Sequence, residues 1–162
     1  MKIGLLSDTH SHIDEKVINF FKDCDEIWHA GDIGDYTIIE TLKSKAKIRA
    51  VYGNIDNSEI RMSCPQYQIF TIENYKVLMT HIGGYPKRYA PKIKSLLLKE
   101  QPDLFISGHS HILKVIMDKE LNILHINPGA YGKNGFHKVR TAIRFCINND
   151  KISDLEILEI QR

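Results

Sequence analysis

Short apolar segments alternate with helix-like segments along the first half of the chain. The apolar run Lys2–Ser7 predicts a buried strand, and apolar residues at helical spacing from Ile13 to Cys24 predict a helix after it. The same order returns with a strand at Glu26–Ala30, a helix at Tyr36–Lys43 and a strand at Ile48–Tyr52. Strand–helix–strand order at this spacing is typical of a parallel sheet.

The second half of the chain favours strands. Tyr67–Ile72 and Tyr75–Thr80 predict a hairpin, Pro91–Glu100 predicts a helix, and Leu104–Ser107 predicts another buried strand. Turn residues then separate four further strand-like segments, which indicate an antiparallel second sheet. These segments are Lys114–Asp118, Leu121–Asn127, Thr141–Ile147 and Lys151–Ile160.

Length and composition limit the class of protein. With 162 residues and no repeat or linker, we expect a single domain over residues 1–162. No apolar run approaches the roughly 18 residues of a membrane span, and the N-terminus does not resemble a secretory signal, so we expect a cytoplasmic protein without a membrane partner. The net charge of +2 is too balanced to indicate a nucleic-acid-binding protein.

Polar clusters follow the predicted strands at the points where the strands end. Because the carboxyl ends of strands in an open α/β sheet lie along one edge, we expect these clusters to converge on a common crevice. A glycine precedes several of the polar residues, where a turn off a strand favours a residue without a side chain. The clusters are Asp8-Thr9-His10, Gly31-Asp32, Gly53-Asn54, His81 and Gly108-His109-Ser110-His111.

The converging side chains are of metal-binding types. Aspartate and asparagine offer oxygen and histidine offers nitrogen, a mixture that suits Mn, Fe, Co, Ni or Zn better than Ca. Seven protein ligands are too many for one ion but suit a pair of ions that share a bridging carboxylate. The seven are Asp8, His10, Asp32, Asn54, His81, His109 and His111.

The order of these motifs resembles the calcineurin-like metallophosphoesterases. Their pattern is DxH…GD…GNH(D/E)…H…GHxH, and this chain has DTH, GD, GNID, H and GHSH between Asp8 and His111. The turn Asn127-Pro128-Gly129 is also similar to the small YfcE-like phosphodiesterase branch. The resemblance implies an α/β fold, a four-layer αββα sandwich of two mixed β-sheets flanked by helices.

The resemblance also implies a dinuclear metal centre, with Mn²⁺ favoured and Fe, Co, Ni or Zn as alternatives. Hydroxide between the ions would attack phosphorus in line. Asn54 and His109 would lie near the phosphate oxygens, and the catalytic set would be Asn54, His81 and His109. The first ion would be held by Asp8, His10, Asp32 and His111, and the second by Asp32, Asn54, His81 and His109.

One position departs from the family pattern. The histidine of GNH(D/E), thought to protonate the leaving oxygen or to steady the transition state, is replaced by Ile55. Loss of a general acid typically costs roughly 10²–10⁴-fold, so we expect poor leaving groups to be affected more than good ones. Asp56, which would orient the missing histidine, is expected to cap the following turn instead.

The remaining histidines and nearby cations have weaker signals. An isolated histidine is more often an ordinary core or surface residue than a ligand, and we interpret His29, His125 and His137 in that way. Contact of His12 with the substrate is left open, as is contact of Lys87 or Arg88, for which a plain surface loop is favoured.

The sequence therefore predicts a metal-dependent phosphoesterase with a small phosphodiester substrate and a rather open site. Two alternatives remain. One is a catalytically weak or inactive interaction scaffold, because the retromer scaffold subunit resembles this fold. That subunit departs from the family pattern at the metal histidines, whereas this chain retains them. The other is a nuclease, which would use the same chemistry but needs a basic, aromatic groove that the sequence does not indicate. A homo-oligomer is possible on either reading.

Overall fold

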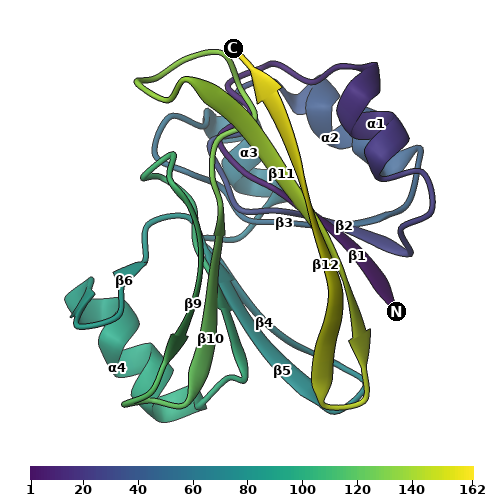
Figure 1. The fold of residues 1–162 in the computed structure, drawn as a ribbon. Helices are drawn as coiled ribbons and strands as arrows, with labels where there is room; N and C mark the ends of the chain where they lie inside the picture. The colour runs from purple at the N-terminus through teal and green to yellow at the C-terminus, as the bar shows by residue number, and fades with distance from the viewer.

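The strands form two five-stranded sheets packed face to face, with a separate two-stranded hairpin (Figure 1). The computed structural model describes all 162 residues. The first sheet has the order β12-β11-β1-β2-β3 and the second β4-β5-β8-β10-β9. The first contains β1 (Lys2–Leu6), β2 (Glu26–His29), β3 (Lys47–Ala50), β11 (Val139–Asn148) and β12 (Lys151–Gln161). The second contains β4 (Tyr67–Ile72), β5 (Tyr75–Thr80), β8 (Leu104–Ile106), β9 (Leu113–Asp118) and β10 (Ile123–Pro128); the hairpin is β6 (Gly84–Tyr85) and β7 (Arg88–Tyr89).

Both sheets are mixed. In the first, β1, β2 and β3 are parallel, and β11 and β12 extend the sheet in antiparallel fashion. In the second, β5, β8 and β10 are parallel, with β4 and β9 antiparallel at the two edges. The predicted parallel core of strands is therefore confirmed.

The C-terminal strands are divided between the sheets, so the prediction of one antiparallel C-terminal sheet was wrong. β9 and β10 complete the second sheet, whereas β11 pairs with β1 in the register Lys2↔Cys146 to Leu5↔Ile143 and carries β12 with it. The reason is burial. Four of the five residues of β1 are buried, and a strand buried in this way needs a hydrogen-bonding neighbour on each side.

The helices cover the outer faces of the sheets (Figure 1). α1 (Glu15–Phe20), α2 (Tyr36–Lys43) and α3 (Ser58–Ser63) pack on the first sheet, and α4 (Pro91–Glu100) packs on the second. Trp28 lies in the layer between the sheets, where it is fully buried against Phe70 and Phe145. The expected four-layer αββα sandwich is confirmed. None of the helices combines the length and apolarity required to cross a membrane.

Three short elements have too little pattern for sequence analysis to detect. α3 has only six residues and begins at Asn57, whose side chain accepts a hydrogen bond from the Ile60 amide. β6 and β7 have two residues each and form a hairpin in the segment that was expected to be a loop.

Candidate metal centre

Polar residues from both sheets gather at one edge of the sandwich, where the parallel strands end. Asp8 and His10 follow β1, Asp32 follows β2 and Asn54 follows β3. From the second sheet, His81 follows β5, and the turn Gly108–His111 follows β8. The convergence expected from the sequence is thus present in the fold.

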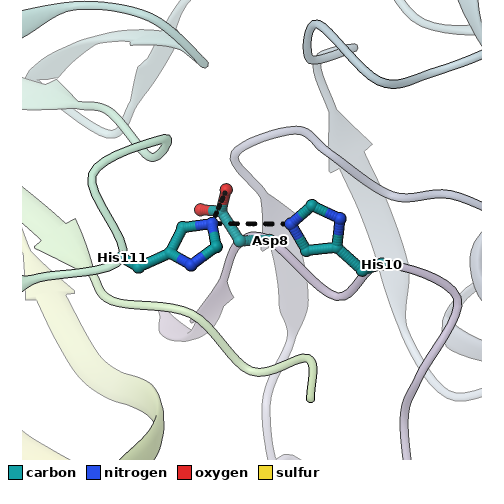
Figure 2. A group of neighbouring side chains, drawn as sticks. All are labelled: Asp8, His10 and His111. Atoms are coloured by element: carbon teal, nitrogen blue, oxygen red, sulfur yellow. Dashed lines mark hydrogen bonds and ion pairs between the residues drawn. The ribbon is translucent and has the colours of Figure 1, made fainter. Parts of the chain in front are cut away.

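Asp8, His10 and His111 form a first group (Figure 2). Their ligand atoms all lie within 4.8 Å of one another. The Nε2 atom of His111 is 3.2 Å from Asp8 Oδ1 and 3.4 Å from His10 Nε2, as the dashed lines in Figure 2 mark. Two imidazoles and a carboxylate therefore face a common point.

Asp32, His81 and His109 form a second group of the same kind, beside the first. His81 Nε2 lies 3.2 Å from Asp32 Oδ1. Each aspartate also approaches the other group, because His10 Nε2 is 4.0 Å from Asp32 Oδ2 and His81 Nε2 is 3.9 Å from Asp8 Oδ1. The two groups are thus adjacent, with carboxylates between them.

Asn54 reaches the same edge through the loop after β3. The amide of Ile55 donates to Asp32 Oδ1 at 3.1 Å, so this loop rests directly on the second group. Gly53 makes the approach possible, since a Cβ at this position would collide with Asp32. Asn54 and His109 are exposed, whereas Asp8, Asp32 and His81 are buried, so the centre is buried on one side and open on the other.

The buried donor atoms fit a cation. Asp8 Oδ1 and His81 Nε2 are buried and have no hydrogen-bond partner in the protein, an arrangement that costs free energy unless another group satisfies them. The Nδ1 atom of His81 lies 2.8 Å from the carbonyl oxygen of Ala30 and donates its proton there, which leaves the lone pair of Nε2 free. Imidazole nitrogen with carboxylate oxygen and no thiolate suits a divalent transition metal.

Left-handed backbone angles occur at five residues of the two groups and at seven other non-glycine residues of the chain. The five are Asp8, His10, Asp32, His109 and His111, with φ between 45° and 69°. Each such residue costs on the order of 1 kcal/mol or more, and costs of this kind cluster at functional sites because the turn aims the side chain. At these five positions the left-handed turn lies where the side chain reaches the shared edge of the two sheets.

Without a bound cation, Asp32 and His81 each favour the charged form of the other. Burial opposes ionisation of both groups, yet the His81 imidazole, 3.2 Å away, outweighs burial and lowers the pKa of Asp32. The carboxylates of Asp32 and Asp8 in turn raise the pKa of His81 against the effect of burial. Asp32 is thereby kept ionised, as a metal ligand must be.

Asp56 and Arg61 hold the Asn54 loop in place. The two carboxylate oxygens of Asp56 accept hydrogen bonds from the Gly34 and Gly53 amides at 2.8 and 2.7 Å. The expectation that Asp56 caps the next turn was wrong, since Asn57 is the cap of α3.

The guanidinium of Arg61 completes this support. It donates to the carbonyl oxygens of Gly53, Asn54 and Asp56 and lies 4.5 Å from the centre of the Tyr52 ring. Arg61 therefore holds the backbone that carries Asn54.

His137 is a neighbour of the first group that sequence analysis missed. Its Nδ1 atom lies 3.2 Å from Nδ1 of His111, and its Nε2 atom lies 2.9 Å from the carbonyl oxygen of Gly132. The irregular segment that contains His137 has no motif or periodicity that would have marked it. The other two histidines interpreted as ordinary are core residues: His29 contacts Thr9 and the Gly31 amide, and His125 contacts Ser107.

Three further candidates lie outside the two groups. His12 Nε2 lies 2.9 Å from Arg140 Nη1 and 3.6 Å from Asp14. Lys87 and Arg88 lie in the β6–β7 hairpin, where Arg88 pairs with Tyr85. None of the three belongs to either group.

Asn127 supports the turn Gly108–His111. Its side-chain amide donates to the Gly108 carbonyl oxygen at 2.8 Å and to Ser110 Oγ at 3.1 Å. The hydroxyl of Tyr85 also hydrogen-bonds to Ser110. These contacts fix the turn that presents His109 and His111.

The fold and this site define a class of protein. The chain belongs to the calcineurin-like phosphoesterase superfamily, whose domain model matches residues 1–150. A probable metallophosphoesterase of Methanothermobacter thermautotrophicus is 35% identical over 135 residues, covering 80% of this chain and 77% of the relative. A phosphodiesterase of Methanocaldococcus jannaschii is 30% identical over 145 residues, covering 80% of this chain and 83% of the relative.

Solved structures share the architecture. Vps29 of Entamoeba histolytica, in complex with zinc, has a TM-score of 0.76 at 15% identity and covers 99% of both chains. An archaeal phosphodiesterase has a TM-score of 0.72 at 24% identity and covers 98% of this chain and 100% of its own. At these identities the likeness shows the fold.

Proposed function

We propose that this protein is a phosphodiesterase that uses two divalent metal ions. The observation that carries the proposal is the pair of adjacent groups, Asp8-His10-His111 and Asp32-His81-His109, with buried donor atoms that lack partners. Membership of the phosphoesterase superfamily supports the reaction class, and the relative named as a phosphodiesterase supports diesters. Mn²⁺ is the ion proposed from the family resemblance, and the donor set suits Fe, Co, Ni or Zn as well.

The residues divide between the two ions with Asp32 shared. When bound, the ions would supply a hydroxide nucleophile and neutralise charge on the phosphate. The first ion would be held by Asp8, His10, Asp32 and His111, and the second by Asp32, Asn54, His81 and His109. Asn54 and His109, the exposed members, would also orient the phosphate oxygens for in-line attack.

The leaving group receives no proton from this loop. Ile55 occupies the position next to Asn54, and 47% of its surface is exposed. An alkyl chain neither donates a proton nor accepts one. We therefore propose that esters with stable leaving anions are the better substrates.

The scaffold alternative has a specific basis, since Vps29 shares the architecture. The Vps29 structure is a zinc complex, so a protein of this architecture can hold a metal ion whether or not it is an enzyme. Turnover, rather than metal content alone, therefore separates the enzyme from the scaffold.

Metal content and turnover test the proposal together. Protein loaded with Mn²⁺ should hold two equivalents and should hydrolyse bis(4-nitrophenyl) phosphate faster than 4-nitrophenyl phosphate. Asp32→Asn should lose at least one equivalent and more than about 10²-fold in rate, because loss of a shared ligand exceeds the usual effect of an outer-shell change. Asp154→Asn, an exposed position on β12, is the matched control and should match the wild type. If Asp32→Asn binds as much metal as the wild type and no form of the protein hydrolyses either substrate, the enzyme proposal is overturned in favour of the scaffold.

A further inference from the structure

A cavity of about 800 Å³ opens beside the second group. Asn54 and His81 form part of its wall, so it is continuous with the candidate metal centre. It lies between the Asn54 loop with α3 on one side and α4 on the other, and Tyr67 at the start of β4 also lines it.

The walls of this cavity are aromatic and aliphatic. Tyr67 and Ile82 keep 46% of their surface exposed, and Leu96 and Ile93 of α4 line the cavity from the other side. Exposed apolar surface of this kind, gathered in a concave site, is typical of ligand pockets. Aromatic side chains bind flat rings well, because stacking removes the two contacting ring faces from water.

The charge of the cavity favours an anion. Arg61 and Lys92 line it, and no aspartate or glutamate does. The guanidinium of Arg61 already lies over Tyr52 and is occupied by three carbonyl oxygens, so the charge of Lys92 is the freer of the two. A phosphoester that carries a flat ring matches both the charge and the apolar walls.

The size of the cavity favours a ring over a small alkyl group. A volume of about 800 Å³ lies within the range of roughly 300–1,000 Å³ that is usual for pockets that hold drug-sized ligands. A methyl or ethyl substituent would leave most of it to water. Because Asn54 belongs to both sites, a phosphate at the centre would direct one of its substituents into the cavity.

We propose that this cavity is the subsite for a planar aromatic substituent, aryl or nucleobase, of a phosphodiester substrate. This inference rests on the proposed function, since the phosphate is taken to lie at the metal centre. Tyr67 is then a specificity-determining residue that contacts the ring, and Lys92 stabilises the anion at the mouth of the cavity.

Two inert phosphonates separate the ring from the phosphate. Phenylphosphonate and methylphosphonate share the anionic head, so their affinities for the Mn²⁺-loaded protein, measured by calorimetry, differ through the ring. We expect phenylphosphonate to bind roughly ten-fold or more tightly than methylphosphonate, as ring stacking predicts. Tyr67→Ala should bring the ratio close to one and leave methylphosphonate binding unchanged. Leu98→Ala, on the same helix as Leu96 but outside the cavity, is the control that keeps the ratio.

Two substrates with the same leaving group then distinguish the source of the ring. The KM values of methyl 4-nitrophenyl phosphate and thymidine 5′-(4-nitrophenyl phosphate) are measured in wild type and in Tyr67→Ala. A larger rise in KM for the thymidine ester identifies the nucleobase as the occupant, and equal rises identify the aryl group.

The outcomes separate this inference from the proposed function. Hydrolysis with equal binding of the two phosphonates, or with a ratio that Tyr67→Ala leaves intact, overturns the subsite while the phosphodiesterase stands. Ring-dependent binding without hydrolysis of either diester keeps the subsite and removes the proposed function.

Discussion

His111 and His137 share a hydrogen bond through their Nδ1 atoms, which lie 3.2 Å apart. The other ring nitrogen of His137, Nε2, lies 2.9 Å from the Gly132 carbonyl oxygen, which only accepts, so Nε2 carries the proton of the neutral ring. Nδ1 of His137 is then the acceptor and Nδ1 of His111 the donor. This leaves the lone pair of His111 Nε2 directed toward Asp8 and His10, as a metal ligand requires.

His137→Ala should therefore weaken metal binding at the first group. Without its acceptor, His111 is free to change tautomer and ring orientation, and loss of such a partner typically costs about 10–100-fold in affinity. Titration of the metal-free protein with Mn²⁺ measures the change. His12→Ala is the control, because His12 contacts Arg140 and Asp14 rather than a member of the group. Equal affinities in the two variants would show that His137 does not position His111.

Asp56→Asn should destabilise the protein by about 1–3 kcal/mol, the usual cost of an unsatisfied buried donor. Both oxygens of Asp56 accept backbone amides, from Gly34 and Gly53, so an amide nitrogen in place of either oxygen would face another donor. Urea unfolding of metal-free protein measures the change in the free energy of unfolding. Asp35→Asn is the matched control, because Asp35 caps α2 through Oδ1 alone and asparagine keeps that acceptor. A loss no larger than that of the control would contradict the role given to Asp56.

The convergence of the candidate ligands was predictable because two simple rules agree. Polar residues directly after apolar strands must lie at a sheet edge, and parallel strands share that edge. Asp8, Asp32 and Asn54 follow the three parallel strands of the first sheet, so their proximity follows from local pattern and topology alone. His81 and His109 reach the same edge because the second sheet repeats the arrangement with β5 and β8.

Contacts between distant segments were not predictable from pattern. β11 has the same alternation whether it pairs with β1 or with β9, and only the burial of β1 between two neighbours decides the choice. Arg61 acts on the Asn54 loop through backbone carbonyls, which leave no trace in sequence. The cavity beside His81 lies between α3 and α4, which pack on different sheets, so predicting it requires the relative positions of both helices.

Ile55→His should speed hydrolysis of diesters with poor leaving groups more than that of nitrophenyl esters. The side chain at this position is exposed beside Asn54, and an imidazole there would supply a general acid, an effect worth roughly 10²–10⁴-fold where protonation limits the rate. Rates for a nitrophenyl diester and an alkyl diester in wild type and variant give the comparison. Ile55→Gln, which is polar but does not titrate, is the control. The same acceleration for both esters, or none for either, would show that this position does not protonate the leaving group.

Acid should destabilise the fold through its buried histidines. Burial lowers the pKa of His125 from 6.5 to about 4, so between these values the unfolded chain binds a proton that the folded chain does not. Protonation of His125 therefore does not lower the free energy of unfolding above pH 6.5. Its effect grows as the pH drops toward 4, where it lowers the free energy of unfolding by on the order of 3 kcal/mol. His29, whose pKa burial also lowers, adds to the same slope.

His125→Phe isolates the contribution of one histidine. A phenyl ring keeps the stacking on Phe105, at 5.0 Å between ring centres, but it cannot take up a proton. The variant should be less stable at pH 7 by about 1 kcal/mol, because Ser107 loses its hydrogen-bond partner, yet its loss of stability between pH 7 and pH 4 should be about 3 kcal/mol smaller than in the wild type. Urea unfolding with a chelator present, at both pH values, measures the four free energies. If wild type and variant lose the same stability on acidification, protonation of His125 in the unfolded chain is not a source of the acid sensitivity.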